Sequence, residues 1–96
     1  MYLEEMFGLN GKVAIVTGGR RGIGQVVACG LAKAGAEVVI FRRTLSPETV
    51  KMITDEGGKA YDIAVDVTAA KGVEVAVAEV MIRSGQIDVV FNNAGV

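Results

Sequence analysis

A glycine-rich segment, residues 17–24, carries the clearest chemistry in this sequence. It reads Thr17-Gly18-Gly19-Arg20-Arg21-Gly22-Ile23-Gly24 and directly follows a short apolar run. At the start of a helix, such a segment offers backbone N–H groups and the positive helix end to an anion, and a Cβ would block a pyrophosphate. The spacing G-x-x-x-G-x-G matches neither the G-x-G-x-x-G pattern nor a Walker loop. We expect a phosphate-binding loop; the alternative is a tight turn that needs glycine only for its backbone.

Two consecutive arginines, Arg42 and Arg43, follow the second apolar run of the sequence. In dinucleotide-binding folds an Asp or Glu about 20 residues past the glycine loop accepts the ribose 2′-OH of NAD. This sequence has no carboxylate there, and two guanidinium groups can bind a 2′-phosphate instead. Arg21 adds a third cation, so the sequence favours NADP(H) over NAD(H). The alternative is that Arg42 and Arg43 are ordinary charged residues at a strand end in water.

The elements that must position these residues alternate along the chain. Apolar, β-branched runs predict strands at 13–17, 38–41, 59–65 and 87–91, and residues 22–34, 47–56 and 69–84 between them have helical spacing. Strands that alternate with helices imply parallel pairing and right-handed crossovers. We predict an α/β fold: half of a doubly wound, Rossmann-type fold, with a parallel four-stranded sheet in the order 3-2-1-4 and three crossover helices. Ser46 and Thr68 are expected helix N-caps, and Gly35 and Gly85 expected helix ends.

Three motifs in this order resemble those of the short-chain dehydrogenase/reductase family. The glycine segment is similar to the coenzyme motif T-G-x-x-x-G-x-G, Asp66-Val67 to the D-V pair, and Asn92-Asn93-Ala94-Gly95 to the N-N-A-G motif. The resemblance covers about residues 11–96. It implies that the dinucleotide contacts the glycine loop, the ends of the second and third strands, and the segment after the fourth.

The resemblance also implies individual roles. Asp66 would accept a hydrogen bond from the adenine amino group; alternatively, it is only a strand-end carboxylate near a helix cap. Asn92 would border the nicotinamide ribose; alternatively, Asn92 and Asn93 are turn formers that bond local backbone. The expected cofactor-binding residues are Gly18, Arg20, Arg21, Gly22, Ile23, Gly24, Arg42, Arg43, Asp66, Val67, Asn92, Ala94 and Gly95.

The Tyr-x-x-x-Lys pair that this family uses for proton transfer is missing from the sequence. Four residues after Tyr2 and Tyr61 stand Met6 and Val65. We therefore expect no catalytic residue in this chain and no turnover by it alone. The predicted function is the coenzyme-binding N-terminal part of an NADP(H)-dependent short-chain oxidoreductase, which transfers hydride between nicotinamide and a carbonyl or alcohol. The alternatives are a non-catalytic, self-associating nucleotide-binding module and a folded remnant.

Composition limits the remaining possibilities. A chain of 96 residues with 51% hydrophobic side chains predicts one folded domain, residues 1–96. The net charge of −1 argues against a nucleic-acid partner, and no apolar stretch predicts a membrane span. The single Cys and the lack of His make a metal site improbable and favour a cytoplasmic protein. An unpaired edge on the fourth strand, or other exposed apolar surface, predicts a homodimer.

Overall fold

The computed structural model describes residues 8–17, 21–45 and 47–92. Its strands are β1 (Val13–Thr17), β2 (Glu37–Arg42), β3 (Lys59–Ala64) and β4 (Val89–Asn92), and its helices are α2 (Arg21–Lys33), α3 (Pro47–Asp55) and α4 (Ala70–Ser84). Strands and helices alternate along the chain, as the apolar pattern predicts. None of the described helices has the length and apolarity that a membrane span needs.

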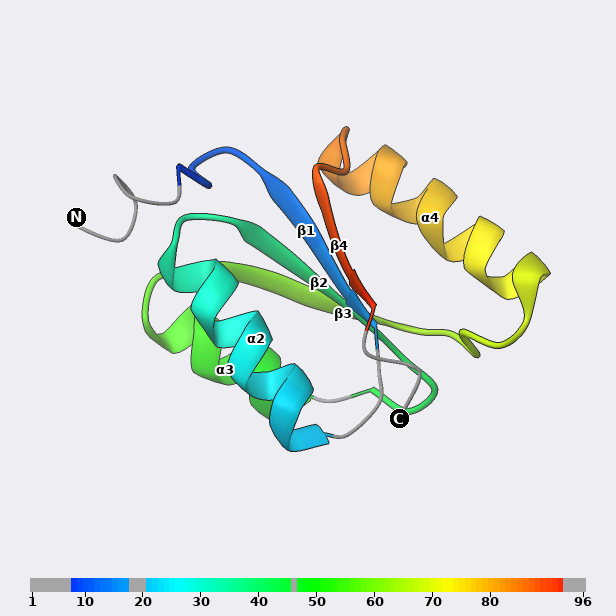
Figure 1. Cartoon of the computed structure of the whole chain (residues 1–96), viewed down its shortest axis with the longest axis horizontal. Helices are drawn as coiled ribbons and strands as arrows, with labels where there is room; N and C mark the ends of the chain where they lie inside the picture. Colours follow the sequence, from blue (N-terminus) through cyan, green and yellow to red (C-terminus); the bar gives the residue numbers. More distant parts are fainter. Residues whose placement is uncertain (1–7, 18–20, 46, 93–96) are drawn as a thin grey trace.

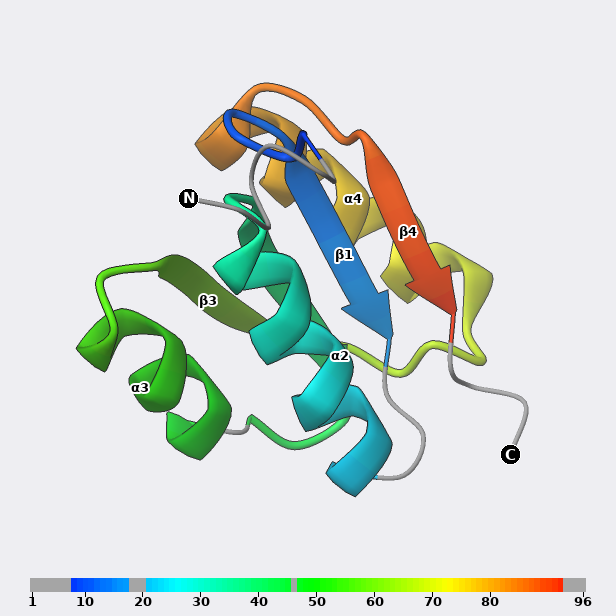
Figure 2. The same cartoon turned by 60° about the vertical axis from the view of Figure 1, so that its left-hand side comes forward.

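The four strands form one parallel sheet in the order β3-β2-β1-β4, so the predicted topology is confirmed. Helices α2 and α3 cover one face of the sheet, and α4 covers the other (Figure 1). The chain crosses from one face to the other after β3, which places β4 beside β1. In Figure 2 these two strands run side by side in the same direction.

Alternation of side chains along the strands divides the core between the two faces. Val13 and Ile15 of β1, with Val39 and Phe41 of β2, pack beneath α4 through its buried residues Ala76 and Val80. The opposite face brings Val16, Val38 and Ile40 against Ala28 of α2 and Ile53 of α3. Each of these strands has a continuous buried apolar run, Val13–Val16 in β1 and Val38–Phe41 in β2, as expected of strands covered on both faces.

Helix ends follow the predicted glycines but not every predicted cap. Gly35 and Gly85 have φ angles of +106° and +82°, the left-handed conformation expected of residues that end a helix. Thr68 was expected to cap α4, and this prediction is wrong. Ala69 is the N-cap and makes no side-chain capping bond, because alanine has no polar side chain. Thr68 lies one residue before the cap position and donates its hydroxyl to Asp66. The other expected cap, Ser46, lies outside the described residues.

The fourth strand begins two residues later than its apolar run suggested. The Val13 backbone N–H donates a hydrogen bond of 2.8 Å to the Asp88 carboxylate, and the Asp88 N–H donates one of 2.9 Å to the Val13 carbonyl. A side chain thus replaces a backbone acceptor at this point, and regular pairing starts with Ala14 against Val89.

Candidate functional site

The carboxyl ends of the four strands meet at one edge of the sheet, which we call the carboxyl edge. The strands end there at Thr17, Arg42, Ala64 and Asn92. The Thr17 hydroxyl donates a 3.0 Å hydrogen bond to the Asn92 side-chain oxygen, which links the ends of the neighbouring strands β1 and β4. In open α/β sheets, ligands bind outside the carboxyl ends of the strands, where the strand order reverses. Here that point lies between β1 and β4.

The glycine segment begins at this edge and runs into α2. Gly18 and Arg20 lie outside the described residues, and of Arg21, Gly22 and Ile23 the structure gives the helical backbone. The first turn of α2 contains no acidic residue that would offset the positive end of the helix. A Cβ added at Gly24 would meet no described heavy atom within 4 Å. Packing among the described residues therefore does not require glycine at this position.

A small pocket lies at the carboxyl ends of β2 and β3. Strand β2 is the neighbour of β1, which leads into the glycine segment. Its volume is about 230 Å³. Its lining includes the three charged residues Arg42, Arg43 and Asp66, which the sequence singled out as separate sites. Val67, also expected from the sequence, lines the pocket with them, and the remaining lining residues, which were not expected in the site, are Phe41, Thr44, Val65 and Thr68. The pocket therefore brings two guanidinium groups and one carboxylate to the same place.

The Asp66 carboxylate makes three contacts, all through its Oδ1 atom. It accepts hydrogen bonds from the Thr68 hydroxyl at 2.6 Å and the Thr68 backbone N–H at 3.0 Å. It also pairs with Arg43, whose Nη2 atom lies 3.5 Å away. The Thr68 hydroxyl and N–H hold the pKa of the Asp66 carboxyl below its ordinary value, and Arg43 adds to this effect. Asp66 is therefore ionised at neutral pH, and its Oδ2 atom makes none of these contacts.

The other expected site residues are placed as follows. Val67, half-buried, packs against the core beneath α4 and lines the pocket with Asp66. Asn92 is exposed at the end of β4, next to β1. Ala94 and Gly95 lie outside the described residues. Thr17 was noted only as the first residue of the glycine motif and Thr68 only as an expected helix cap. Their hydrogen bonds to Asn92 and Asp66 were not expected, because side-chain contacts of this kind have no distinctive pattern in sequence.

Tyr61, in the part of the chain that the structure describes, is engaged elsewhere. Its hydroxyl makes a 2.7 Å hydrogen bond with the Ser84 hydroxyl, and the Arg83 guanidinium lies 3.7 Å from its ring centroid. Both partners belong to the last turn of α4, away from the pocket. Tyr61 thus helps to hold β3 against the end of α4.

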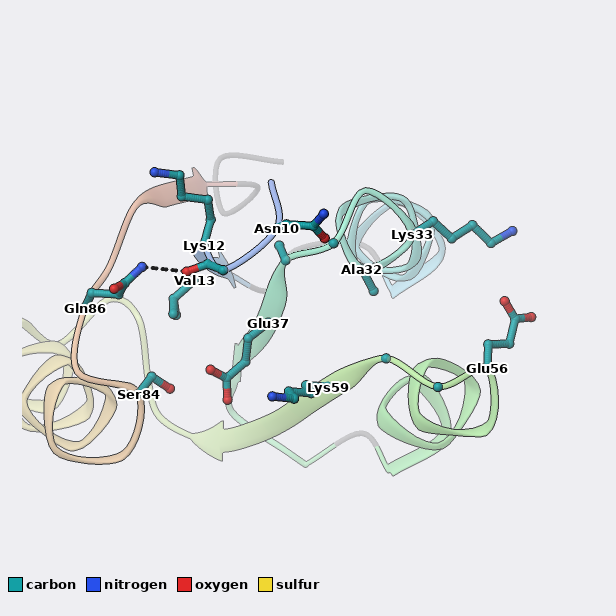
Figure 3. A pocket seen from close by; sticks show the side chains of 15 residues that line it. Asn10, Lys12, Val13, Ala32, Lys33, Glu37, Glu56, Lys59, Ser84 and Gln86 are labelled. Atoms are coloured by element: carbon teal, nitrogen blue, oxygen red, sulfur yellow. Dashed lines mark hydrogen bonds between the residues drawn. The ribbon is translucent and has the colours of Figure 1, made fainter. Parts of the chain in front are cut away.

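A larger pocket, of about 840 Å³, lies at the opposite edge of the sheet, where the strands begin (Figure 3). Its charged lining residues are Lys12, Lys33, Glu37, Glu56 and Lys59. None of the expected cofactor-binding residues lines it. Among the described residues, no group of three or more His, Cys, Asp or Glu side chains is placed to hold a metal ion.

Comparison with known proteins identifies the family. A family model described as short chain dehydrogenase matches residues 12–96. A 2-dehydro-3-deoxy-D-gluconate 5-dehydrogenase of Bacillus subtilis is 38% identical over 96 residues, covering 99% of this chain and 37% of that protein. A hydroxynaphthalene reductase of Aspergillus fumigatus is 40% identical over 90 residues, covering 91% of this chain and 33% of that protein. The chain thus spans about a third of the length of these relatives.

Solved structures agree with this assignment. A metagenomic short-chain oxidoreductase in complex with NADP matches with a TM-score of 0.85 and 37% identity, covering 92% of this chain and 41% of that one. A hydroxysteroid dehydrogenase from Escherichia coli also gives a TM-score of 0.85, at 33% identity, covering 92% of this chain and 38% of that one. The parallel sheet, its strand order and the sequence match agree, and the chain belongs to the short chain dehydrogenase family.

Proposed function

We propose that residues 1–96 form a single dinucleotide-binding domain, the coenzyme-binding part of an NADP(H)-dependent short-chain oxidoreductase. The observation that carries this proposal is the pocket that holds Arg42, Arg43 and Asp66 together at the carboxyl edge. Its arginines suit the 2′-phosphate, and Oδ2 of Asp66 suits the adenine amino group as an acceptor. The NADP complex of a relative with a similar fold supports the same preference.

The remaining expected residues extend this site along the carboxyl edge. The glycine segment, through Gly18, Arg20, Arg21, Gly22, Ile23 and Gly24, would hold the pyrophosphate at the start of α2. Val67 would lie along the adenine, and Asn92, Ala94 and Gly95 would border the nicotinamide ribose. When bound, the nicotinamide supplies the hydride that is exchanged with a carbonyl or alcohol carbon in the whole protein. The lone Cys29 and the net charge of −1 support a cytoplasmic protein without a nucleic-acid partner.

Thermal melting with and without nucleotide tests the proposed function. A ligand that binds only the folded state raises the melting temperature by mass action. We expect NADPH to raise it more than NADH at equal concentration, and the Arg42→Gln/Arg43→Gln double variant to lose this difference. Lys51→Gln, which removes an exposed cation from α3, is the matched control and should retain it. Equal shifts for NADPH and NADH in the unmodified chain would contradict the assignment.

A second proposal, self-association through β4, rests on the exposure of this strand. In the described sheet β4 pairs only with β1, so its other side is an edge. Val90 is 60% exposed and Phe91 37% exposed, whereas the corresponding apolar residues of β1 are buried. Such an edge favours pairing with another strand, and a second copy of this chain would supply one.

Sedimentation analysis of Val90→Lys tests this association. A lysine on an exposed edge strand opposes edge-to-edge pairing. We expect the unmodified chain to be a dimer at micromolar concentration and the variant to be a monomer. Val26→Lys changes a valine of α2 that is 72% exposed, more than Val90, and should leave the dimer intact. A monomeric unmodified chain across this concentration range would refute the proposal.

A further inference from the structure

The two residues expected to read the adenosine part of the cofactor contact each other. Nη2 of Arg43 lies 3.5 Å from Oδ1 of Asp66, and both side chains line the same pocket. Building on the cofactor-binding function above, we propose that Asp66 restrains binding of the 2′-phosphate by competing for Arg43. Asp66 thereby sets how strongly the site prefers NADP(H) over NAD(H).

Asp66 is a fixed negative charge in this pocket. Two donors from Thr68 hold its Oδ1 atom, at 2.6 and 3.0 Å, and these bonds stabilise the ionised form. The turn from β3 into α4 contains both residues, so the carboxylate cannot move away without losing these bonds. Any anion that enters the pocket therefore meets a carboxylate as well as the arginines.

Arg43, by contrast, is free to exchange partners. Its side chain is 77% exposed, and 3.5 Å is longer than the roughly 2.7–2.9 Å of the strongest charge-assisted hydrogen bonds. Exposed ion pairs of this kind contribute little to stability. Arg42, the adjacent residue, makes no ion pair with any residue that the structure describes, so it stays available as a second cation.

Both ways of binding a 2′-phosphate through Arg43 carry a penalty from Asp66. If the guanidinium stays on Asp66, the phosphate that it binds lies near a carboxylate, and the like charges repel each other. If the guanidinium turns to the phosphate, Asp66 loses its cationic partner. A 2′-hydroxyl carries no charge and requires neither change, so the penalty falls on NADP(H) and not on NAD(H).

Calorimetric titration of the Asp66→Asn variant with NADPH and NADH tests the inference. Asparagine keeps an oxygen that can accept from Thr68, but it removes the charge and places an amide NH2 group where Oδ2 would accept from adenine. Any loss of adenine binding affects both nucleotides, so it cancels in the ratio of the NADH Kd to the NADPH Kd. We expect this ratio to rise about three- to tenfold, the effect of removing one like charge from a solvated phosphate site.

Two further variants distinguish an effect of the Arg43–Asp66 ion pair from a general effect of removing one negative charge. Asp55→Asn removes the same charge from an exposed pair with Lys51 on α3, and the ratio should not change. In an Arg43→Gln background, Asp66→Asn should change the ratio less than it does in the unmodified chain. An unchanged or lower ratio in Asp66→Asn alone, or an equal rise in both backgrounds, would overturn the inference. Failure of the unmodified chain to bind either nucleotide would instead refute the proposed function, and this inference with it.

Discussion

The Thr17 hydroxyl donates a hydrogen bond of 3.0 Å to the side-chain oxygen of Asn92, joining the last residues of β1 and β4. These residues are the first of the glycine segment and of the N-N-A-G-like segment. The bond therefore fixes the relative position of two segments that are 75 residues apart in the chain. The strand ends at which the cofactor is expected to bind are thus connected before any ligand arrives.

Replacing Thr17 with valine should weaken this connection. Valine keeps the shape and strand preference of threonine but cannot donate a hydrogen bond, so we expect a loss of about 1 kcal/mol in the free energy of unfolding. Urea denaturation of Thr17→Val, Asn92→Ala and the double variant measures the coupling between the two side chains. Strictly additive losses would show that the two side chains do not interact.

Gly35 and Gly30 should respond in opposite directions to alanine. Gly35 has a φ angle of +106°, and a Cβ there would lie 2.1 Å from Oδ1 of Asn10 and 3.0 Å from its Cα. We expect Gly35→Ala to lower the free energy of unfolding by about 1–3 kcal/mol. Gly30 is an exposed residue within α2, where a Cβ meets nothing within 4 Å, so Gly30→Ala should raise it by about 0.5–1 kcal/mol. Urea midpoints of both variants check this, and equal effects would contradict the assigned conformations.

Gly24→Ala should separate binding from folding. A Cβ at Gly24 meets no described atom within 4 Å, and alanine favours a helix, so the stability of the fold should stay the same or increase. If a pyrophosphate approaches this backbone, the added methyl group should weaken NADPH binding by about tenfold or more. Calorimetry and urea denaturation of one variant measure both quantities. Unchanged NADPH affinity would favour the alternative that this glycine only serves the turn.

Acid should weaken the link between β1 and β4 through Asp88. The Val13 N–H, and secondarily the Gln86 side chain, hold the pKa of the Asp88 carboxyl below its ordinary value. A lowered pKa in the folded state stabilises the fold above the unfolded-state pKa of about 3.9, and this stabilisation disappears as the pH falls through the folded-state pKa. The urea midpoint of Asp88→Asn should therefore fall less steeply than that of the unmodified chain as the pH is lowered from about 6 to about 2. Parallel profiles would contradict this role of Asp88.

The sequence predicted the topology well because its signals are local and repeated. Continuous apolar runs at 13–17 and 38–41 indicate strands covered on both faces, and Gly35 and Gly85 mark helix ends wherever the fold places them. The error at Thr68 has a local cause, since α4 begins one residue later than expected, with Ala69 as the N-cap, and the Thr68 hydroxyl binds the nearby Asp66 carboxylate. The Arg43–Asp66 contact joins two loops through side chains, and no spacing in the sequence encodes such a contact.

Direct calorimetric titration of the unmodified chain with NADPH and with NADH, in one buffer at one salt concentration, tests the central claim. The charges in the pocket of Arg42, Arg43 and Asp66 predict that NADPH binds more tightly than NADH. Tighter binding of NADH, or no binding of either nucleotide, would contradict it.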